Sequence, residues 1–106
     1  MRQVKKKTDR YVRQILETLK RQYGSAHPKA KIEAYRYNPA SIRIRIIDPD
    51  FKGMDRVQRD DLVSAILDTL PEDVRAEITV LLLLTPQERK TSPMSQEFDH
   101  PAPALL

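Results

Sequence analysis

A run of alternating isoleucines and arginines, followed by a turn and an amphipathic helix, constrains the fold of this chain more than any other feature. The run covers residues 41–47, and its side chains alternate between the two faces of an extended segment. Ile42, Ile44 and Ile46 lie on one face, and Arg43, Arg45 and Ile47 on the other. This alternation predicts a strand with one face in the core and the other at least partly wet, as is usual in antiparallel sheets.

The segment after this strand predicts a loop and a long helix. In the loop Phe51-Lys52-Gly53, we expect the aromatic ring to close the core end of the sheet and the glycine to permit the turn. The helix is expected from about Asp55 to Leu70, because Asp55 and Gln58 have the spacing of a capping box. Its apolar stripe follows at helical spacing: Leu62, Val63, Ile66, Leu67 and Leu70.

Three further segments complete the predicted element order. A helix is expected from Thr8 or Asp9 to Gly24, and strands over residues 31–37 and 77–84. The last strand is almost continuously apolar, which favours a central position or cover on both faces. A crossover helix makes the second and third strands parallel. We therefore predict an α/β fold, an α+β two-layer sandwich of order α-β-β-α-β, in which a three-stranded mixed sheet carries helices on one face.

Length and composition indicate one domain in a chain of 106 residues. Residues 1–7 are predicted to be a flexible basic arm, residues 8–89 the folded domain, and residues 90–106 a disordered tail rich in Pro and Ser. The absence of cysteine excludes disulfides and thiolate-bound metals. No apolar run reaches the ~20 residues of a membrane span, and the N-terminus lacks a secretory signal, so a cytoplasmic protein without membrane contact is expected.

The charges are distributed unevenly along the chain, although the net charge is only +4. Residues 1–47 hold 13 Lys/Arg and 3 Asp/Glu, whereas residues 48–88 hold 4 Lys/Arg and 10 Asp/Glu. A basic half can attract nucleic acid or an acidic partner. It can equally form solvated faces that the acidic half complements, and this is the reading we favour.

With these elements placed, the chain resembles the BolA family, which shares its fold with type II KH domains. The resemblance covers roughly residues 9–88 and rests on two short patterns. The first is Phe51-x-Gly53-x-x-x-Val57-x-Arg59-x-x-Leu62-Val63, and the second is Thr85-Pro86-x-Glu88 at the end of the last strand. The resemblance implies a non-enzymatic regulatory domain that binds other proteins.

The chain departs from both families where their ligands are bound. BolA proteins share an iron–sulfur cluster with a glutaredoxin through a histidine after the arginine that matches Arg59, and here that position is Asp60. Their second histidine or cysteine lies in the loop between the first two strands, where this chain has Asn38-Pro39-Ala40-Ser41. Carboxylates suit such soft metal sites poorly, so cluster sharing with a glutaredoxin is not expected. The Gly-x-x-Gly loop of KH domains is also absent.

The surface with the most recognition chemistry is the second face of the predicted sheet. If Tyr35 and Tyr37 share that face with Arg43 and Arg45, aromatic rings lie beside guanidinium groups. This combination suits a protein partner or homodimer, or stacked bases. A solvated face with Glu33 paired to an arginine is the plain alternative. Leu81 and Leu83 are expected to share the face, which would favour a protein partner.

Two candidate surfaces follow for two kinds of partner. The protein-interface candidates are Tyr35, Tyr37, Arg43, Arg45, Phe51 and Arg59, although Phe51 and Arg59 are first interpreted as structural. Arg59 is expected to pair with Asp55, Asp48 or Asp50. A nucleic-acid-binding KH-like module is the alternative, and it would use Lys5, Lys6, Lys7, Arg10, Arg13, Arg43 and Arg45.

Catalysis and metal binding are not predicted from the sequence. His27 and His100 are the only histidines, and neither has a carboxylate or hydroxyl at a spacing that suggests a catalytic triad. The acids at residues 48–61 do not have the spacing of a calcium loop, and turn and cap roles account for them. We therefore predict no enzyme activity, no catalytic residues, no metal and no cofactor.

Overall fold

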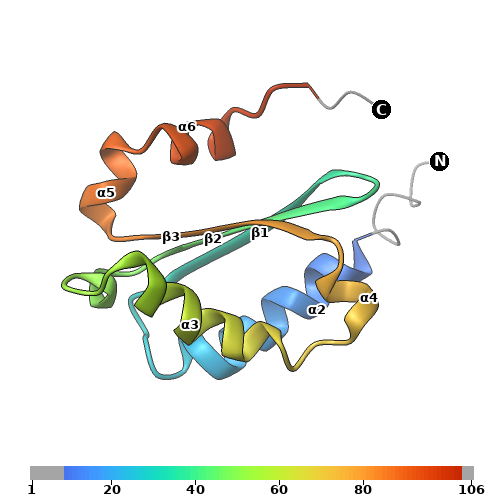
Figure 1. Cartoon of the computed structure of the whole chain (residues 1–106), viewed down its shortest axis with the longest axis horizontal. Coiled ribbons are helices and arrows are strands. Elements are labelled where there is room, and N and C mark those ends of the chain that lie inside the picture. Colours follow the sequence, from blue (N-terminus) through green and yellow to red (C-terminus); the bar gives the residue numbers. More distant parts are fainter. Residues whose placement is uncertain (1–8, 104–106) are drawn as a thin grey trace.

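The computed structural model describes residues 9–103, and the predicted basic arm at residues 1–7 lies outside that range. A three-stranded sheet forms the centre, with strand order β1-β2-β3 (Figure 1). The strands are β1 (Lys31–Asn38), β2 (Ser41–Ile47) and β3 (Ile78–Leu84). The helices are α2 (Arg10–Leu19), α3 (Arg56–Leu67), α4 (Glu72–Arg75), α5 (Pro86–Thr91) and α6 (Pro93–Asp99), with a π-helical segment η1 (Lys20–Gly24) and a 3-10 turn η2 (Pro49–Phe51).

The predicted α+β class and the mixed sheet are confirmed. β1 pairs antiparallel with β2, and β2 pairs parallel with β3 across the crossover through α3 and α4. The predicted capping box is present, because Asp55 exchanges bonds with Gln58 at the start of α3, and Thr85 forms a second one with Glu88 at the start of α5. The local cap chemistry therefore fixes where two of the helices begin.

The register of β2 is the predicted one. Ile42, Ile44 and Ile46 have no exposed surface and form the centre of the core. They pack against Ile15 and Leu19 of α2 on one side and the apolar positions of α3 on the other. Figure 1 shows α2, α3 and α4 together beneath this face of the sheet. Burial of so many apolar side chains on one face is the main stabilising term of the fold.

β3 differs from the prediction in its position and its phase. It lies at the edge of the sheet, because β2 is the central strand. Leu81 and Leu83 pair with Ile44 and Ile46 and turn toward the core, whereas we expected them on the opposite face. A register shift at Ile42/Arg43 sets this phase. Alternation along an apolar strand cannot reveal which of its two faces is inward.

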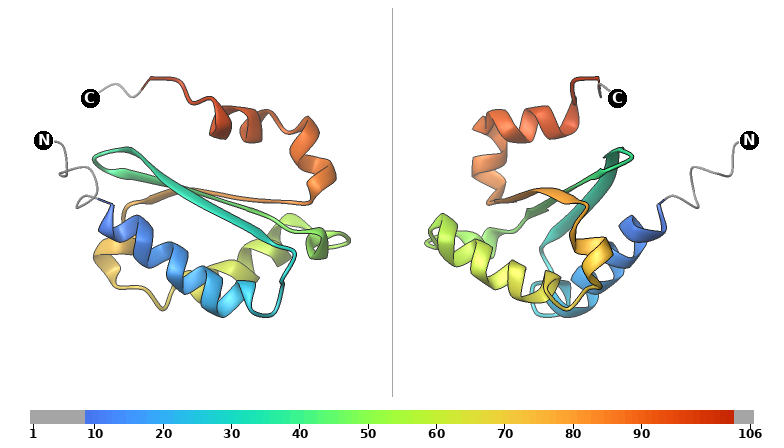
Figure 2. Two further views of the ribbon diagram at one scale, coloured as in Figure 1. Left: turned by 180° about the vertical axis from the view of Figure 1, so that it is seen from behind. Right: turned by 45° about the vertical axis from the view of Figure 1, so that its right-hand side comes forward.

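The second face of the sheet is covered by a helix that the sequence did not predict. Residues 93–99 form α6, and Figures 1 and 2 show it lying across the sheet on the side opposite α2 and α3. Ser95 and Phe98 are the buried residues of this helix. The predicted disordered tail is therefore wrong over residues 90–99, and helices lie on both faces instead of one. Among residues 9–103, no helix is long and apolar enough to cross a membrane.

Candidate functional sites: the covered sheet face and a histidine–carboxylate cluster

The sheet face that we expected to bind a partner is occupied by the chain's own α6. Tyr35 pairs with Arg43, and Glu33 with Arg45, across the two strands, so these side chains do share one face as predicted. The Tyr35 hydroxyl donates to the Phe98 carbonyl at 2.8 Å, and the two rings are 4.8 Å apart. The Tyr37 hydroxyl donates to the Ala102 carbonyl at 2.7 Å.

Arg45 is the centre of this covered face, with only 1% of its surface exposed. Its guanidinium donates two bonds to Glu33, at 2.8 and 2.9 Å, and one to Asp99 at 2.8 Å. It also donates to the Ser95 hydroxyl and lies 4.4 Å from the centre of the Phe98 ring. Burial opposes the charge, but the bonds to the two carboxylates outweigh it and raise the pKa of Arg45.

Arg43 binds the same helix through a second acid. It donates to Glu97 at 2.7 Å and stacks over Tyr37 at 3.6 Å from the ring centre. The hydrogen bond from Arg45 is the main cause of the lowered pKa of Asp99. The four candidate residues Tyr35, Tyr37, Arg43 and Arg45 are thus brought together, but intramolecular contacts already use them. The prediction of an open face is wrong.

The remaining predicted interface residues are structural. Phe51 is fully buried in the core. Arg59 donates to the Leu83 carbonyl at 3.0 Å and to both carboxylate oxygens of Glu88, at 2.6 and 3.1 Å. The sequence predicted Asp55, Asp48 or Asp50 as its partner, but Arg59 forms its ion pair with Glu88 instead. The bond from Arg59, with further bonds at the Thr85 cap, lowers the pKa of Glu88 from its ordinary 4.5 to about 2.

The residues of the nucleic-acid alternative do not come together in the described structure. Lys5, Lys6 and Lys7 lie outside the described residues. Arg10 and Arg13 are exposed on α2, which packs on the sheet face opposite α6. Arg43 and Arg45 are buried or partly buried on the covered face and paired with acids. Guanidinium groups held by carboxylates offer no ready contact to phosphates.

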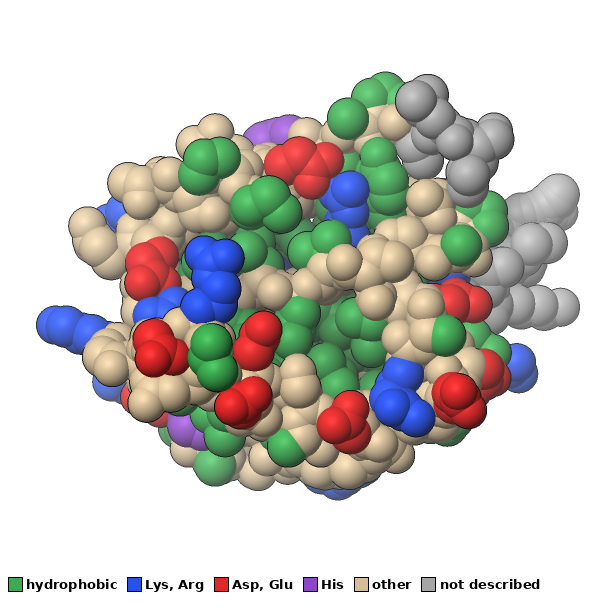
Figure 3. Space-filling model, viewed as in Figure 1, with side chains coloured by type: hydrophobic (Ala, Val, Ile, Leu, Met, Phe, Trp, Pro, Cys, Tyr) green, Lys and Arg blue, Asp and Glu red, His purple; other side chains and the backbone are tan. Residues whose placement is uncertain are grey.

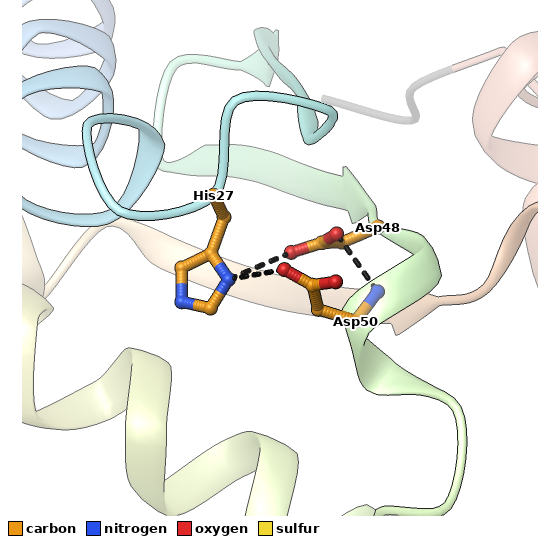
Figure 4. Close-up of side chains that lie close together, drawn as sticks. All are labelled: His27, Asp48 and Asp50. Atoms are coloured by element: carbon orange, nitrogen blue, oxygen red, sulfur yellow. Dashed lines mark hydrogen bonds and ion pairs between the residues drawn. The ribbon is translucent and has the colours of Figure 1, made fainter.

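A second cluster joins His27 to two carboxylates at one end of the sheet (Figure 4). The linker after η1 carries His27, and the turn after β2 carries Asp48 and Asp50. The His27 Nδ1 atom lies 2.8 Å from Asp50 Oδ2 and 3.5 Å from Asp48 Oδ2. Asp48 also accepts the Tyr23 hydroxyl at 2.5 Å and the Asp50 backbone N–H at 3.0 Å. No carboxylate was predicted near His27 from the sequence, but the fold brings two of them to it.

The cluster is partly open to solvent. Asp48 is fully buried, whereas the His27 side chain is 25% exposed and Asp50 is largely exposed. The imidazole stacks on the Tyr23 ring with centres 4.1 Å apart. Burial is the main cause of the raised pKa of Tyr23, and the bond to Asp48 and the two nearby negative charges add to it. This is the one group of three potential metal ligands found among residues 9–103.

The exposed edge of β3 is a third feature of interest. Figure 3 shows hydrophobic side chains in the recess between β3 and the helices below it, and acidic side chains along those helices. Leu62 of α3 is 39% exposed, although it belongs to the predicted apolar stripe. Leu81, Ile66 and Ile78 are partly buried at the border of the core. An apolar edge strand of this kind is unusual, because sheet edges are normally protected.

Comparison with known proteins yields no relative for this chain. No family model, no curated protein and no solved structure matches it.

Proposed function

We propose that this protein is a non-enzymatic protein-binding module that takes up an extended segment of a partner along the free edge of β3. The observation that carries the proposal is an apolar edge strand, Ile78–Leu84, with no neighbour beyond β2 in the described sheet. The element order and the Phe51–Gly53 turn support the resemblance to BolA proteins at the level of fold, and we keep that assignment as part of the proposal.

The backbone of β3 has the hydrogen-bonding groups that strand addition needs. The Leu84 carbonyl accepts from Asp48 and therefore points toward β2. Because backbone groups alternate in direction along a strand, those of Leu81 and Leu83 point to the other edge. Arg59 donates a hydrogen bond to the Leu83 carbonyl. The backbone groups of Leu81 therefore remain available to pair with an added strand. Main-chain bonds of this kind supply affinity, and flanking side chains supply specificity.

The chemistry beside β3 favours a basic and apolar partner segment. Leu62 and the border residues Ile66 and Ile78 offer apolar contacts on the helix side of the edge. Figure 3 shows acidic side chains along the helices below β3, and the exposed acids of α3 and α4 include Asp60, Asp61 and Glu72. Complementary charges steer association and exclude wrong partners. An extended segment that alternates lysine or arginine with apolar residues fits both features.

The same acids argue against a symmetric pairing of two copies through β3. In such a dimer the two edges meet around a twofold axis, which brings the same surface of each copy face to face. The α3 helices would then approach each other with like charges, and this is destabilising. Pairing of two copies through β3 is therefore the second hypothesis for this edge, and the test below distinguishes it from binding of a partner segment.

The test uses NMR titration of the full chain with a fluorescein-labelled peptide of alternating lysine and valine. We expect amide shifts centred on residues 78–84 and an affinity at least tenfold above that for the matching glutamate–valine peptide. Asp61→Lys should weaken binding severalfold, and Glu17→Lys on the exposed side of α2 is the matched control. Equal binding of both peptides, or shifts confined to α2, would contradict the proposal.

Two other results would instead favour a homodimer or a nucleic-acid partner. Concentration-dependent shifts at residues 78–84 without peptide, with a dimer in sedimentation, would replace the partner segment by a second copy. Binding of a single-stranded oligonucleotide that falls steeply with salt and is lost in the Arg10→Ser/Arg13→Ser double variant would favour nucleic acid.

A further inference from the structure

We propose that His27, Asp48 and Asp50 bind one divalent transition-metal ion of the zinc type, independently of the function proposed for β3. The donor atoms are one imidazole nitrogen and two carboxylate oxygens, which come from two separate turns of the chain (Figure 4). Imidazole selects first-row transition ions such as Zn²⁺, and carboxylates accept the same ions.

The distances between the donor atoms fit a metal polyhedron. Adjacent ligand atoms about 2.0–2.2 Å from a zinc ion lie about 2.8–3.6 Å apart in octahedral or tetrahedral sites. In the cluster, the His27 Nδ1 atom is 2.8 Å from Asp50 Oδ2 and 3.5 Å from Asp48 Oδ2, and all three donor atoms lie within 4.8 Å of one another. The two distances from His27 are therefore those of neighbouring ligands of one ion, and the largely exposed Asp50 side chain is free to adjust its distance to Asp48.

The electrostatics of the cluster favour a cation independently of its geometry. Asp48 is fully buried, and among residues 9–103 no lysine or arginine forms an ion pair with it or with Asp50. Within the described residues their ionic partner is His27, which carries a charge only when protonated. Buried carboxylates normally have a fixed positive partner, because removing a charge from water is costly. A divalent ion provides that charge.

Neighbouring groups already hold the donor side chains in place, as the hydrogen-bond partners of metal ligands do in metal sites. The Tyr23 hydroxyl and the Asp50 backbone N–H fix the orientation of the Asp48 carboxylate. The Tyr23 ring fixes the plane of the imidazole by stacking. The partly exposed His27 and the largely exposed Asp50 leave an open side, where water completes the coordination. Metal ions bind an imidazole nitrogen that carries no proton, so metal binding depends on pH.

The experiment titrates the full chain with Co²⁺, followed by visible absorption, and then with Zn²⁺ by calorimetry. We expect one saturable equivalent, displacement of Co²⁺ by Zn²⁺, and a rise in the melting temperature with Zn²⁺ that a chelator reverses. His27→Gln should lower the affinity at least tenfold. His100→Gln removes the only other histidine, which is exposed, and should bind as the unmodified chain does.

Asp50→Asn provides a second variant, because its exposed side chain is removed with little risk to folding. It should also lower the Co²⁺ affinity while the amide spectrum stays folded. Absence of a saturable equivalent would overturn the proposal, and so would equal affinities of His27→Gln and His100→Gln. In either case the cluster is a hydrogen-bonded link between the two turns and nothing more.

Discussion

Replacing Phe98 by alanine is expected to release α6 from the sheet while the rest of the domain stays folded. Phe98 is 5% exposed, and its ring contacts Tyr35 and the guanidinium of Arg45. Its burial is the only large apolar contribution from α6, because Met94, the other large hydrophobic residue of that helix, is 54% exposed.

The size of the effect follows from the burial of the ring. A fully buried Phe→Ala change costs about 3–5 kcal/mol, and the lower end applies here because the site is near the surface and can be filled by solvent. A loss of about 3 kcal/mol corresponds to an increase of about a hundredfold in the open population of α6. The core lies on the opposite face of β2, so its stability should change far less.

Hydrogen exchange followed by mass spectrometry measures this directly. We expect amides of residues 96–100 to lose about two orders of magnitude of protection in Phe98→Ala, while those of β2 keep theirs. Met94→Ala is the matched control on the same helix and should leave both segments unchanged. Retained protection in α6 together with a loss in β2 would refute the idea that Phe98 anchors the helix.

Three further predictions test other parts of the structure. Glu88→Gln removes a carboxylate whose folded pKa is about 2, so the stability it contributes is present above pH 4.5 and lost toward pH 2. The full pKa shift corresponds to about 3 kcal/mol, but solvent screening of a half-exposed group reduces this to about 1 kcal/mol. Chemical denaturation at pH 7 and pH 3 should therefore show a smaller acid-induced loss of stability in Glu88→Gln than in the unmodified chain. An equal loss of stability in the two would contradict the pairing with Arg59. Gly53→Ala should cost about 1–2 kcal/mol by thermal melting, because φ is +86° there, whereas Gly24→Ala should be neutral because its new Cβ meets only ordinary contacts. Ile44→Ala should cost about 2–5 kcal/mol from the centre of the core, and a value under 1 kcal/mol would place that side chain elsewhere.

The features predicted correctly from the sequence depend on neighbouring residues. The alternation over residues 41–47 sets the register of β2, because a shift of one residue would bury Arg43 and Arg45 in the apolar core. The capping boxes at Asp55 and Thr85 need only the residue three positions later. In each case the pattern and its physical cause lie within one short segment, which a single sequence displays.

The features missed depend on contacts between distant parts of the chain. Residues 93–99 are rich in polar residues and too short to be stable as an isolated helix, and α6 exists because Glu97 and Asp99 meet Arg43 and Arg45 more than 50 residues away. The approach of His27 to Asp50 is likewise a product of the fold. The available signal for α6 was an aromatic residue, Phe98, between two acids in a chain whose second strand carries two arginines on one face.

The docking of α6 has a practical consequence for anyone who shortens this protein. A version that stops before Pro93 would present two strand arginines, two tyrosines and a row of partly buried leucines and valine to solvent at once. Such a surface would attract oligonucleotides, acidic proteins and other copies of itself. Binding activities measured on a trimmed chain would then report a property that the intact molecule keeps out of reach.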